Sequence, residues 1–380
     1  MELLSLTSVA SQMRKGAPLP WNVRTASGQL LLARGQILAT DDDIDALLER
    51  GMFVDAAELR VRGGDVAPLY RNVFERWAAM ERRLATLLRS RPQDLGSRIT
   101  ELALGVGELA DEHADELIFA VVQYDHGRFS AYGVAHAMHV AAVCALLARR
   151  LSNTEEQRQS LLCAALTMNM SIVELQGQLA SRGGKPTTAE RAAIERHPIA
   201  AAEALRSLGV TDELWLRLVA EHHEQPDGDG YPSGIEAQCE LVNLLHLVDV
   251  FTAKYAARAD RAGLPARIAA QQLFIQSGRH PVAALLIKEF GMYPPGCIVK
   301  LSNGETAVVV RRGAQVNQPI AAVFINRNGL PVSPPLRRDT SRSDCAVVMS
   351  LSPEGILVQH AVEQLYESAQ PGGVAARWSN

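Results

Sequence analysis

An almost unbroken series of helical segments between residues 96 and 290 constrains the fold of this 380-residue chain more than any other feature. One segment, TTAERAAIERHPIAAAEALRSLG, opens with a capping box from Thr187 to Glu190 and closes at Gly209. Another, ELVNLLHLVDVFTAKYAARADR, is apolar over most of its length. Apolar helix faces must pack against one another, so the sequence predicts a mainly α protein whose largest domain is a helical bundle.

Different patterns flank this helical domain. Residues 1–65 mix short strand-like runs with a capped helical run, and we expect a small α+β unit there. The amphipathic run at 69–90 predicts a helix within a connecting segment, residues 66–95, and is typical of a linker or of a homodimer contact. Residues 291–368 predict a β-rich appendage with Asn-Gly turns and a short closing helix. We expect the remaining residues, 369–380, to be a disordered tail.

Composition narrows the classes of function. The net charge is −4 and no basic block is present, which argues against binding to nucleic acid polymers. The five cysteines are scattered without a CxxC pair, which favours reduced thiols over a disulfide framework or a cysteine zinc site. No run is predicted to reach the roughly 18 apolar residues of a membrane span. We therefore expect a cytoplasmic protein that does not enter a membrane.

Side chains that bind metals lie on helix faces that should be buried. His136 lies on an apolar face, His222 continues the face of Trp215, and Asp249 lies within the apolar run LLHLVDVF. A buried carboxylate is costly unless it is paired or bound to a cation, and converging histidines and carboxylates build metal centres inside helical bundles. The simpler interpretation is that Asp249 pairs with His246 three residues earlier and that the histidines are packed in the core.

The stretch HHEQPDGDGYPSG, residues 222–234, has the pattern HHExxDGxGYP. This pattern resembles the signature of the HD-GYP family, a branch of the HD-domain phosphohydrolases. The surrounding segments VAHAMHV, ERHPIAAAEAL and LVDVFTAKYAARADR are similar to other helices of that family. The resemblance covers roughly residues 120–290. It implies an HD-domain bundle that hydrolyses cyclic di-GMP, or a related cyclic dinucleotide, with two or three metals, often iron or manganese.

The resemblance also implies roles for individual residues. Metal ligands are implied at five positions, namely His136, His197, His222, His223 and Asp249. Phosphate contacts are implied for Arg258 and Arg261, which we expect to share one helix face because they are three apart. A solvated basic stripe is the alternative for these two arginines. Gly230, Tyr231 and Pro232 are implied to border the ligand pocket and to contact a partner such as a GGDEF cyclase protein.

One segment departs from the family pattern. AALTMNMSI stands where the family has a run like AALLHDIGK, so that Met168 and Asn169 replace the His-Asp pair and Ile172 replaces the lysine. Tyr132 stands where an acidic residue is usual. The missing aspartate bridges two metals in the family. A neutral amide at position 169 cannot neutralise two cations roughly 3.5–4 Å apart.

These departures predict an impaired metal centre. We expect either one divalent metal (iron, manganese or zinc) on His197, His222 and His223, or no metal. The neighbouring metal position keeps His136 and Asp249, which is too little for tight binding. The favoured hypothesis is a degenerate HD-GYP protein that binds a cyclic dinucleotide or a GGDEF-type partner with weak or no hydrolysis. The alternatives are an active cyclic di-GMP phosphodiesterase with an altered metal centre and a purely structural interaction module.

Overall fold

The computed structural model describes residues 3–6, 19, 21–32, 36, 46–47, 52–55, 72–123, 129–151, 153–236, 239–351 and 366. The chain divides into two compact units, Met1–Arg71 and Asn72–Asn380. The predicted tail at 369–380 lies outside the described residues, as do most of the predicted closing helix and most of the helical run in the first unit. The domain boundaries drawn from the sequence stay predictions.

The smaller unit contains a four-stranded antiparallel sheet. Its strands follow the order β1-β4-β2-β3. They are β1 (Leu3–Ser5), β2 (Val23–Arg24), β3 (Leu30–Leu32) and β4 (Phe53–Asp55). Trp21, Val23 and Val54 belong to a small apolar cluster of this unit. A separate core of its own agrees with the small strand-containing unit that the sequence predicts.

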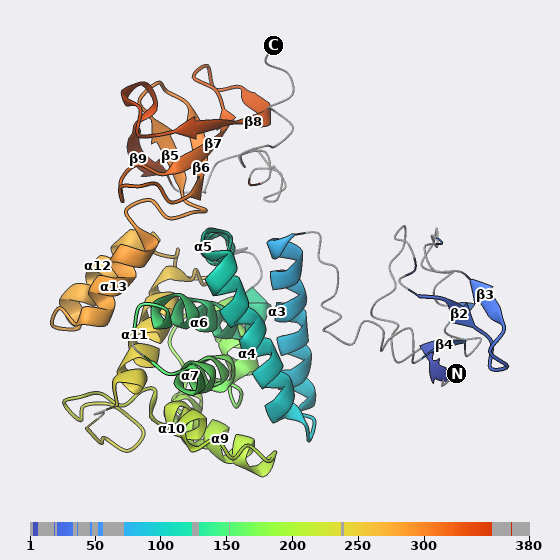
Figure 1. Cartoon of the computed structure of the whole chain (residues 1–380). Coiled ribbons are helices and arrows are strands. Elements are labelled where there is room, and N and C mark those ends of the chain that lie inside the picture. Colours follow the sequence, from blue (N-terminus) through green and yellow to red (C-terminus); the bar gives the residue numbers. More distant parts are fainter. Residues whose placement is uncertain are drawn as a thin grey trace. The chain divides into compact units, whose positions relative to one another are not determined.

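The larger unit is mainly helical (Figure 1), which confirms the predicted fold class. Its helices are α3 (Val73–Ser90), α4 (Leu95–Glu112), α5 (Ala114–Val122), α6 (Tyr132–Ala148), α7 (Glu155–Thr167), α8 (Val173–Arg182), α9 (Thr188–Ser207), α10 (Glu213–Glu221), α11 (Glu240–Tyr255), α12 (Ala266–Gln276) and α13 (Pro281–Phe290). Helix α6 packs against α3, α4, α7, α8 and α11. Nearly every residue of α6 is buried, so α6 is the central helix of the bundle.

Capping chemistry fixes the ends of the helices that lead to the site. The predicted capping box of α9 is confirmed, since Thr187 Oγ1 accepts from the backbone N–H of Glu190 and the Glu190 carboxylate accepts from that of Thr187. Helix α10 is capped by Asp212, whose side chain accepts a hydrogen bond from the backbone N–H of Trp215. These caps set where α9 and α10 begin, and the candidate site takes its histidines from α9 and from the residues that follow α10.

Residues 129–148 correct one expectation about membranes. By length and mean hydropathy, 1.6 over the window, this helical run is long and apolar enough to cross a membrane. However, 89% of that window is buried inside the protein. The run coincides with α6, and its hydropathy is that of the core helix of a bundle.

A five-stranded antiparallel sheet follows the helices and confirms the predicted β-rich region. The strand order is β8-β7-β6-β5-β9, formed by β5 (Ile298–Leu301), β6 (Thr306–Arg311), β7 (Ile320–Ile325), β8 (Pro331–Asp339) and β9 (Val347–Leu351). Arg312, just after β6, bonds to Asp115 of α5 at 2.5 Å and to Glu289 of α13 at 2.7 Å. Glu289 is 2% exposed, so this ion pair fixes the sheet to the helices from within.

Candidate metal and ligand site

His197 is oriented by the proline that follows it in α9. Pro198 has no backbone N–H, so it cannot make the helical bond to the carbonyl of Ile194. Nδ1 of His197 is hydrogen-bonded to that carbonyl instead, at 2.5 Å. The His-Pro dipeptide therefore locks the imidazole by local backbone chemistry and turns Nε2 toward the site.

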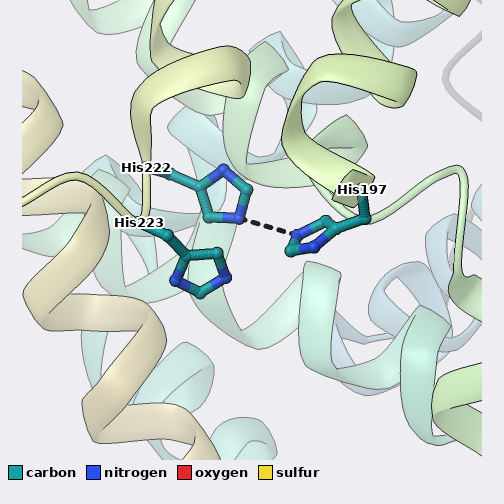
Figure 2. A group of neighbouring side chains, drawn as sticks. All are labelled: His197, His222 and His223. Carbon is teal, nitrogen blue, oxygen red and sulfur yellow. Dashed lines mark hydrogen bonds between the residues drawn. The ribbon is translucent and has the colours of Figure 1, made fainter. Parts of the chain in front are cut away.

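His222 and His223 follow the last turn of α10, where backbone carbonyls have no helical partner. Nδ1 of His222 binds one of these carbonyls, that of Val219, at 2.8 Å. The three imidazoles of His197, His222 and His223 face a common space (Figure 2), and their ligand atoms all lie within 4.8 Å of one another. The predicted three-histidine set is therefore brought together.

The hydrogen bonds assign the tautomers of two of these rings. A carbonyl oxygen can only accept, so Nδ1 carries the proton in both His197 and His222. Both neutral rings then present the lone pair of Nε2, and these two atoms lie 3.1 Å apart along the dashed contact in Figure 2. Two lone pairs at this separation are stable when a proton or a metal ion lies between them.

Burial disfavours a proton between these two nitrogens. Burial lowers the pKa of His197, and burial together with the neighbouring histidines lowers that of His222 well below its ordinary value. Burial also lowers the pKa of His223 to about 3. Because the neutral imidazole is the form that binds metals, this donor set fits one divalent ion. Nitrogens on a tetrahedral ion at about 2.0–2.1 Å stand roughly 3.3 Å apart, close to the observed separation.

The other two predicted ligands bind each other. His136 of α6 and Asp249 of α11 are both buried, and Nε2 of His136 lies 2.7 Å from Oδ1 of Asp249. Burial alone would raise the pKa of Asp249, but the hydrogen bond and charge of His136 hold it well below its usual range. The alternative pairing with His246 is wrong, since Nδ1 of His246 binds the carbonyl of His222 at 2.9 Å.

The segment that departs from the family pattern forms the turn after α7. Met168 is fully buried in the main core, whereas Asn169 is 5% exposed and lines the same pocket as His136, His197 and Asp249. Ile172 lines this pocket as well. Position 169 therefore lies at the pocket that His197 and His223 line, and it offers a neutral amide there.

The loop after His223 is held by a buried carboxylate. Glu224 is 1% exposed and accepts hydrogen bonds from the backbone N–H groups of Ser233, at 2.7 Å, and Ile235, at 3.2 Å. A Cβ at Gly230 would lie 2.5 Å from the Cα of Glu224, so this position requires glycine. The loop returns Tyr231 onto the ring of His223, with centroids 4.5 Å apart.

These elements enclose a pocket of about 230 Å³. Of the residues for which ligand contacts were predicted, Tyr231 and Arg258 line this pocket. Gly230 and Pro232 are not among the lining residues and belong to the loop that presents Tyr231. The pocket thus joins the three-histidine site to an arginine through apolar walls such as Ile194 and Leu179.

Arg258 and Arg261 do not share a helix face, which corrects the sequence-based expectation. Helix α11 ends at Tyr255, and the two arginines pair across a tight turn as an isolated antiparallel bridge. The guanidinium of Arg261 binds the backbone carbonyls of Ala253, at 2.7 Å, and Ala256, at 3.3 Å. Arg261 therefore caps the end of α11, and its guanidinium is engaged outside the pocket lining.

Sequence reasoning missed residues that shape the far end of the pocket. Gln176 of α8 lines it, and so does Asp260, whose carboxylate accepts from the backbone N–H of Gly184 at 2.7 Å. A bond between the end of α8 and the turn after α11 leaves no signal in the sequence. Glu224 did leave one, because an acid next to two histidines and before a glycine-rich loop is a candidate loop anchor.

Comparison with known proteins gives consistent matches. A sequence profile described as HD domain matches residues 84–280, just over half of the chain. A cyclic di-GMP phosphodiesterase of Pseudomonas aeruginosa is 27% identical over 237 residues, which are 59% of this chain and 57% of that protein. The 3′3′-cGAMP-specific phosphodiesterase 3 of Vibrio cholerae is 30% identical over 138 residues, 36% of this chain and 30% of that protein.

A further relative is the cyclic di-GMP phosphodiesterase response regulator RpfG of Xanthomonas campestris. It is 27% identical over 186 residues, 48% of this chain and 45% of the relative. The chain thus spans between about a third and somewhat more than half of the length of these curated relatives.

Proposed function

This chain belongs to the HD domain family, and from that premise we propose that it is a cyclic-dinucleotide-binding signalling protein with weak or no hydrolysis. On this proposal a cyclic dinucleotide, of which cyclic di-GMP is the first candidate, binds in the pocket between the three histidines and Arg258. The names of the curated relatives, which are phosphodiesterases of cyclic di-GMP or 3′3′-cGAMP, support that class of ligand. We further propose a cytoplasmic location and a GGDEF-type partner at the loop of residues 224–234.

The observation that carries this proposal is the residue at position 169. Asn169 lines the pocket together with His197, His223 and Asp249, where two adjacent cations would need a bridging anion. An amide supplies a neutral oxygen, so the repulsion between two ions a few ångströms apart stays uncompensated. A single ion cannot hold both the attacking and the leaving oxygen of a phosphodiester. Hydrolysis therefore loses the stabilisation that a pair of ions gives to these two oxygens.

The protein's own residues are suited to binding. His197, His222 and His223 would hold one divalent metal, which when bound supplies a positive charge for a phosphate oxygen. Arg258 offers guanidinium N–H groups at the pocket, and its Nε is buried without a hydrogen-bond partner among the described residues. Tyr231 and the apolar walls exclude water from the ligand.

A second candidate function is an active phosphodiesterase with an altered metal centre. The observation in its favour is the preorganised three-histidine set, because three histidines and a water ligand form a known catalytic metal site. The two candidates differ in turnover and in the number of ions, and both are measurable on one sample.

The decisive experiment uses the full chain purified anaerobically and loaded with iron or manganese. We expect about one metal ion per chain, binding of cyclic di-GMP in calorimetry, and conversion slower by at least about 100-fold than expected from a median enzyme turnover of about 10 per second. Sustained, multiple-turnover hydrolysis by a one-metal sample would establish the second candidate. Binding of no metal and no nucleotide would leave the structural interaction module as the remaining interpretation.

A further inference from the structure

Tyr132 stands at the start of α6, where the family pattern has an acid, and it is 4% exposed. Its ring is parallel to that of His136, with an interplanar angle of 7° and centroids 5.6 Å apart. The phenol therefore covers one face of the imidazole that is bonded to Asp249. A carboxylate at this position would add a metal ligand, whereas the aromatic ring adds none.

Tyr132 also contacts Arg258. The guanidinium carbon lies 5.3 Å from the centroid of the Tyr132 ring, and an amino group of Arg258 donates to the phenol oxygen at 3.3 Å. A ring face and a hydroxyl together hold the guanidinium by a cation–π contact and a hydrogen bond. Asp249, His136, Tyr132 and Arg258 therefore form one continuous series of contacts along the pocket.

The backbone of Arg258 is fixed independently of this contact. Its N–H and C=O both pair with Arg261, at 2.8 and 3.1 Å. The next residue, Ala259, donates its N–H to the carbonyl of Ala180 in α8 at 2.9 Å. The main chain is thus anchored on both sides, and the hydrogen bond and cation–π contact of the guanidinium are made with Tyr132. The Nε atom of Arg258 and Nδ1 of His136 are buried and lack hydrogen-bond partners among the described residues.

A phosphodiester anion bound in this pocket needs a positively charged group on each side of its phosphate. The three histidines can hold one cation, while Nε2 of His136 and Oδ1 of Asp249 are bonded to each other and the ring of Tyr132 stacks on that of His136. The charge that a second metal would supply must come from another group. Among the residues that line the pocket, Arg258 provides the cationic side chain.

We propose that Tyr132 is the positioning residue that fixes the Arg258 guanidinium as the second positive group for a phosphodiester ligand. This inference deepens the proposed function, since it names what replaces the second cation at the same site. It assigns position 132 to ligand affinity rather than to metal binding. The group recognised is the phosphodiester anion, whatever bases it carries.

The test compares three variants in one apolar cluster, which Tyr132 forms with Ala180, Ala256 and Phe129. Tyr132→Phe keeps the ring and removes the hydroxyl. We expect affinity to fall about 3-fold, which corresponds to the loss of one part-buried hydrogen bond. Tyr132→Leu removes the ring as well, and we expect a loss of about 10-fold or more, in line with a partly desolvated cation–π contact. Phe129→Leu is the matched control, because Phe129 packs in the same cluster, and its affinity should equal that of the wild type.

A double-mutant cycle separates positioning from general packing. Arg258→Met removes the guanidinium but keeps an apolar stem, and in that background Tyr132→Leu should change affinity less than about 2-fold. Metal content should stay the same in all variants, and thermal unfolding should verify that each is folded. Losses that simply add, or a Tyr132→Leu variant that binds as the wild type does, would overturn the inference.

Two probes keep the inference distinct from the proposed function. The cycle is run with cyclic di-GMP and with bis(4-nitrophenyl) phosphate, a simple phosphodiester without bases. Coupled binding of the simple diester without binding of cyclic di-GMP would support the role of Tyr132 and reject the nucleotide. Binding of cyclic di-GMP that does not depend on Tyr132 would do the reverse, and binding of neither probe would reject both.

Discussion

The two halves of the pocket differ in what their polar groups bind. In the half formed by His197, His222 and His223, each assigned Nδ1 is bonded to a backbone carbonyl, so that Nε2 stays available. In the half formed by His136 and Asp249, the two candidate ligand atoms are bonded to each other at 2.7 Å. The first half is preorganised for an ion, and the second half is closed by side-chain pairing.

On the proposed function, this difference accounts for one ion being bound where the family pattern has two. The histidines of the first half are held by backbone carbonyls. Pro198 leaves one of these carbonyls without its helical partner, and the end of α10 supplies the other, so neither depends on the second half. On the proposal, Asn169 in place of the bridging acid removes support for a second ion and leaves the three histidines in place. The proposal therefore assigns ligand binding and catalysis to different structural elements of the pocket.

The largest expected effect is the loss of metal from a variant of the first half. Since removal of an outer hydrogen-bond partner alone costs roughly 10–100-fold in metal affinity, His222→Ala should cost more than about 100-fold. The matched variant of the second half is His136→Gln. Because His136 is bonded to Asp249 and not to one of the three histidines, this variant should change metal affinity by less than about 3-fold. Elemental analysis and metal titration measure both. Equal losses in the two variants would show that the two halves are not independent.

A smaller gain is expected when the missing charge is restored. Met168→His with Asn169→Asp should raise the metal content from about one ion toward two, because the carboxylate can bridge two cations. Turnover of cyclic di-GMP should then rise by about 10-fold or more. Met168 is fully buried in the core, so Asn169→Asp alone is the milder variant, and Asn169→Ala is the control without added charge. A folded double variant without extra metal would mean that the His136–Asp249 pair itself keeps the second ion out.

The sequence predicted the parts of this pocket that depend on local chemistry. The capping box at Thr187 and the mainly α bundle follow from residue types at short spacing, whereas the meeting of the three histidines was implied by the family resemblance of the motifs. The pairing of His246 with Asp249 is a local expectation that failed. The backbone carbonyl of His222, just after α10, accepts a hydrogen bond from Nδ1 of His246 instead. Competition between residues distant in sequence decides such a pairing.

The end of α11 was missed for the same reason. The segment after Tyr255 has helix-favouring alanines and arginines and reaches Gly263 before a helix-breaking residue occurs. Tertiary hydrogen bonds override this propensity, because Ala259 bonds to the carbonyl of Ala180 and Arg258 pairs with Arg261. The two arginines, which looked equivalent by spacing, thereby acquire different partners.

The smallest expected effect tests that difference. Arg261→Ala should change the affinity for cyclic di-GMP by less than about 2-fold, because its guanidinium binds carbonyls at the end of α11 instead of facing the ligand. Loss of this cap should lower the free energy of unfolding by about 0.5–1 kcal/mol. Calorimetry and urea unfolding measure the two quantities. Because Arg258 lines the pocket, Arg258→Ala should show the opposite balance, with a large loss of affinity and little change in stability. An affinity loss at Arg261 as large as that at Arg258 would mean that both arginines reach the ligand, and that the turn after α11 rearranges when it binds.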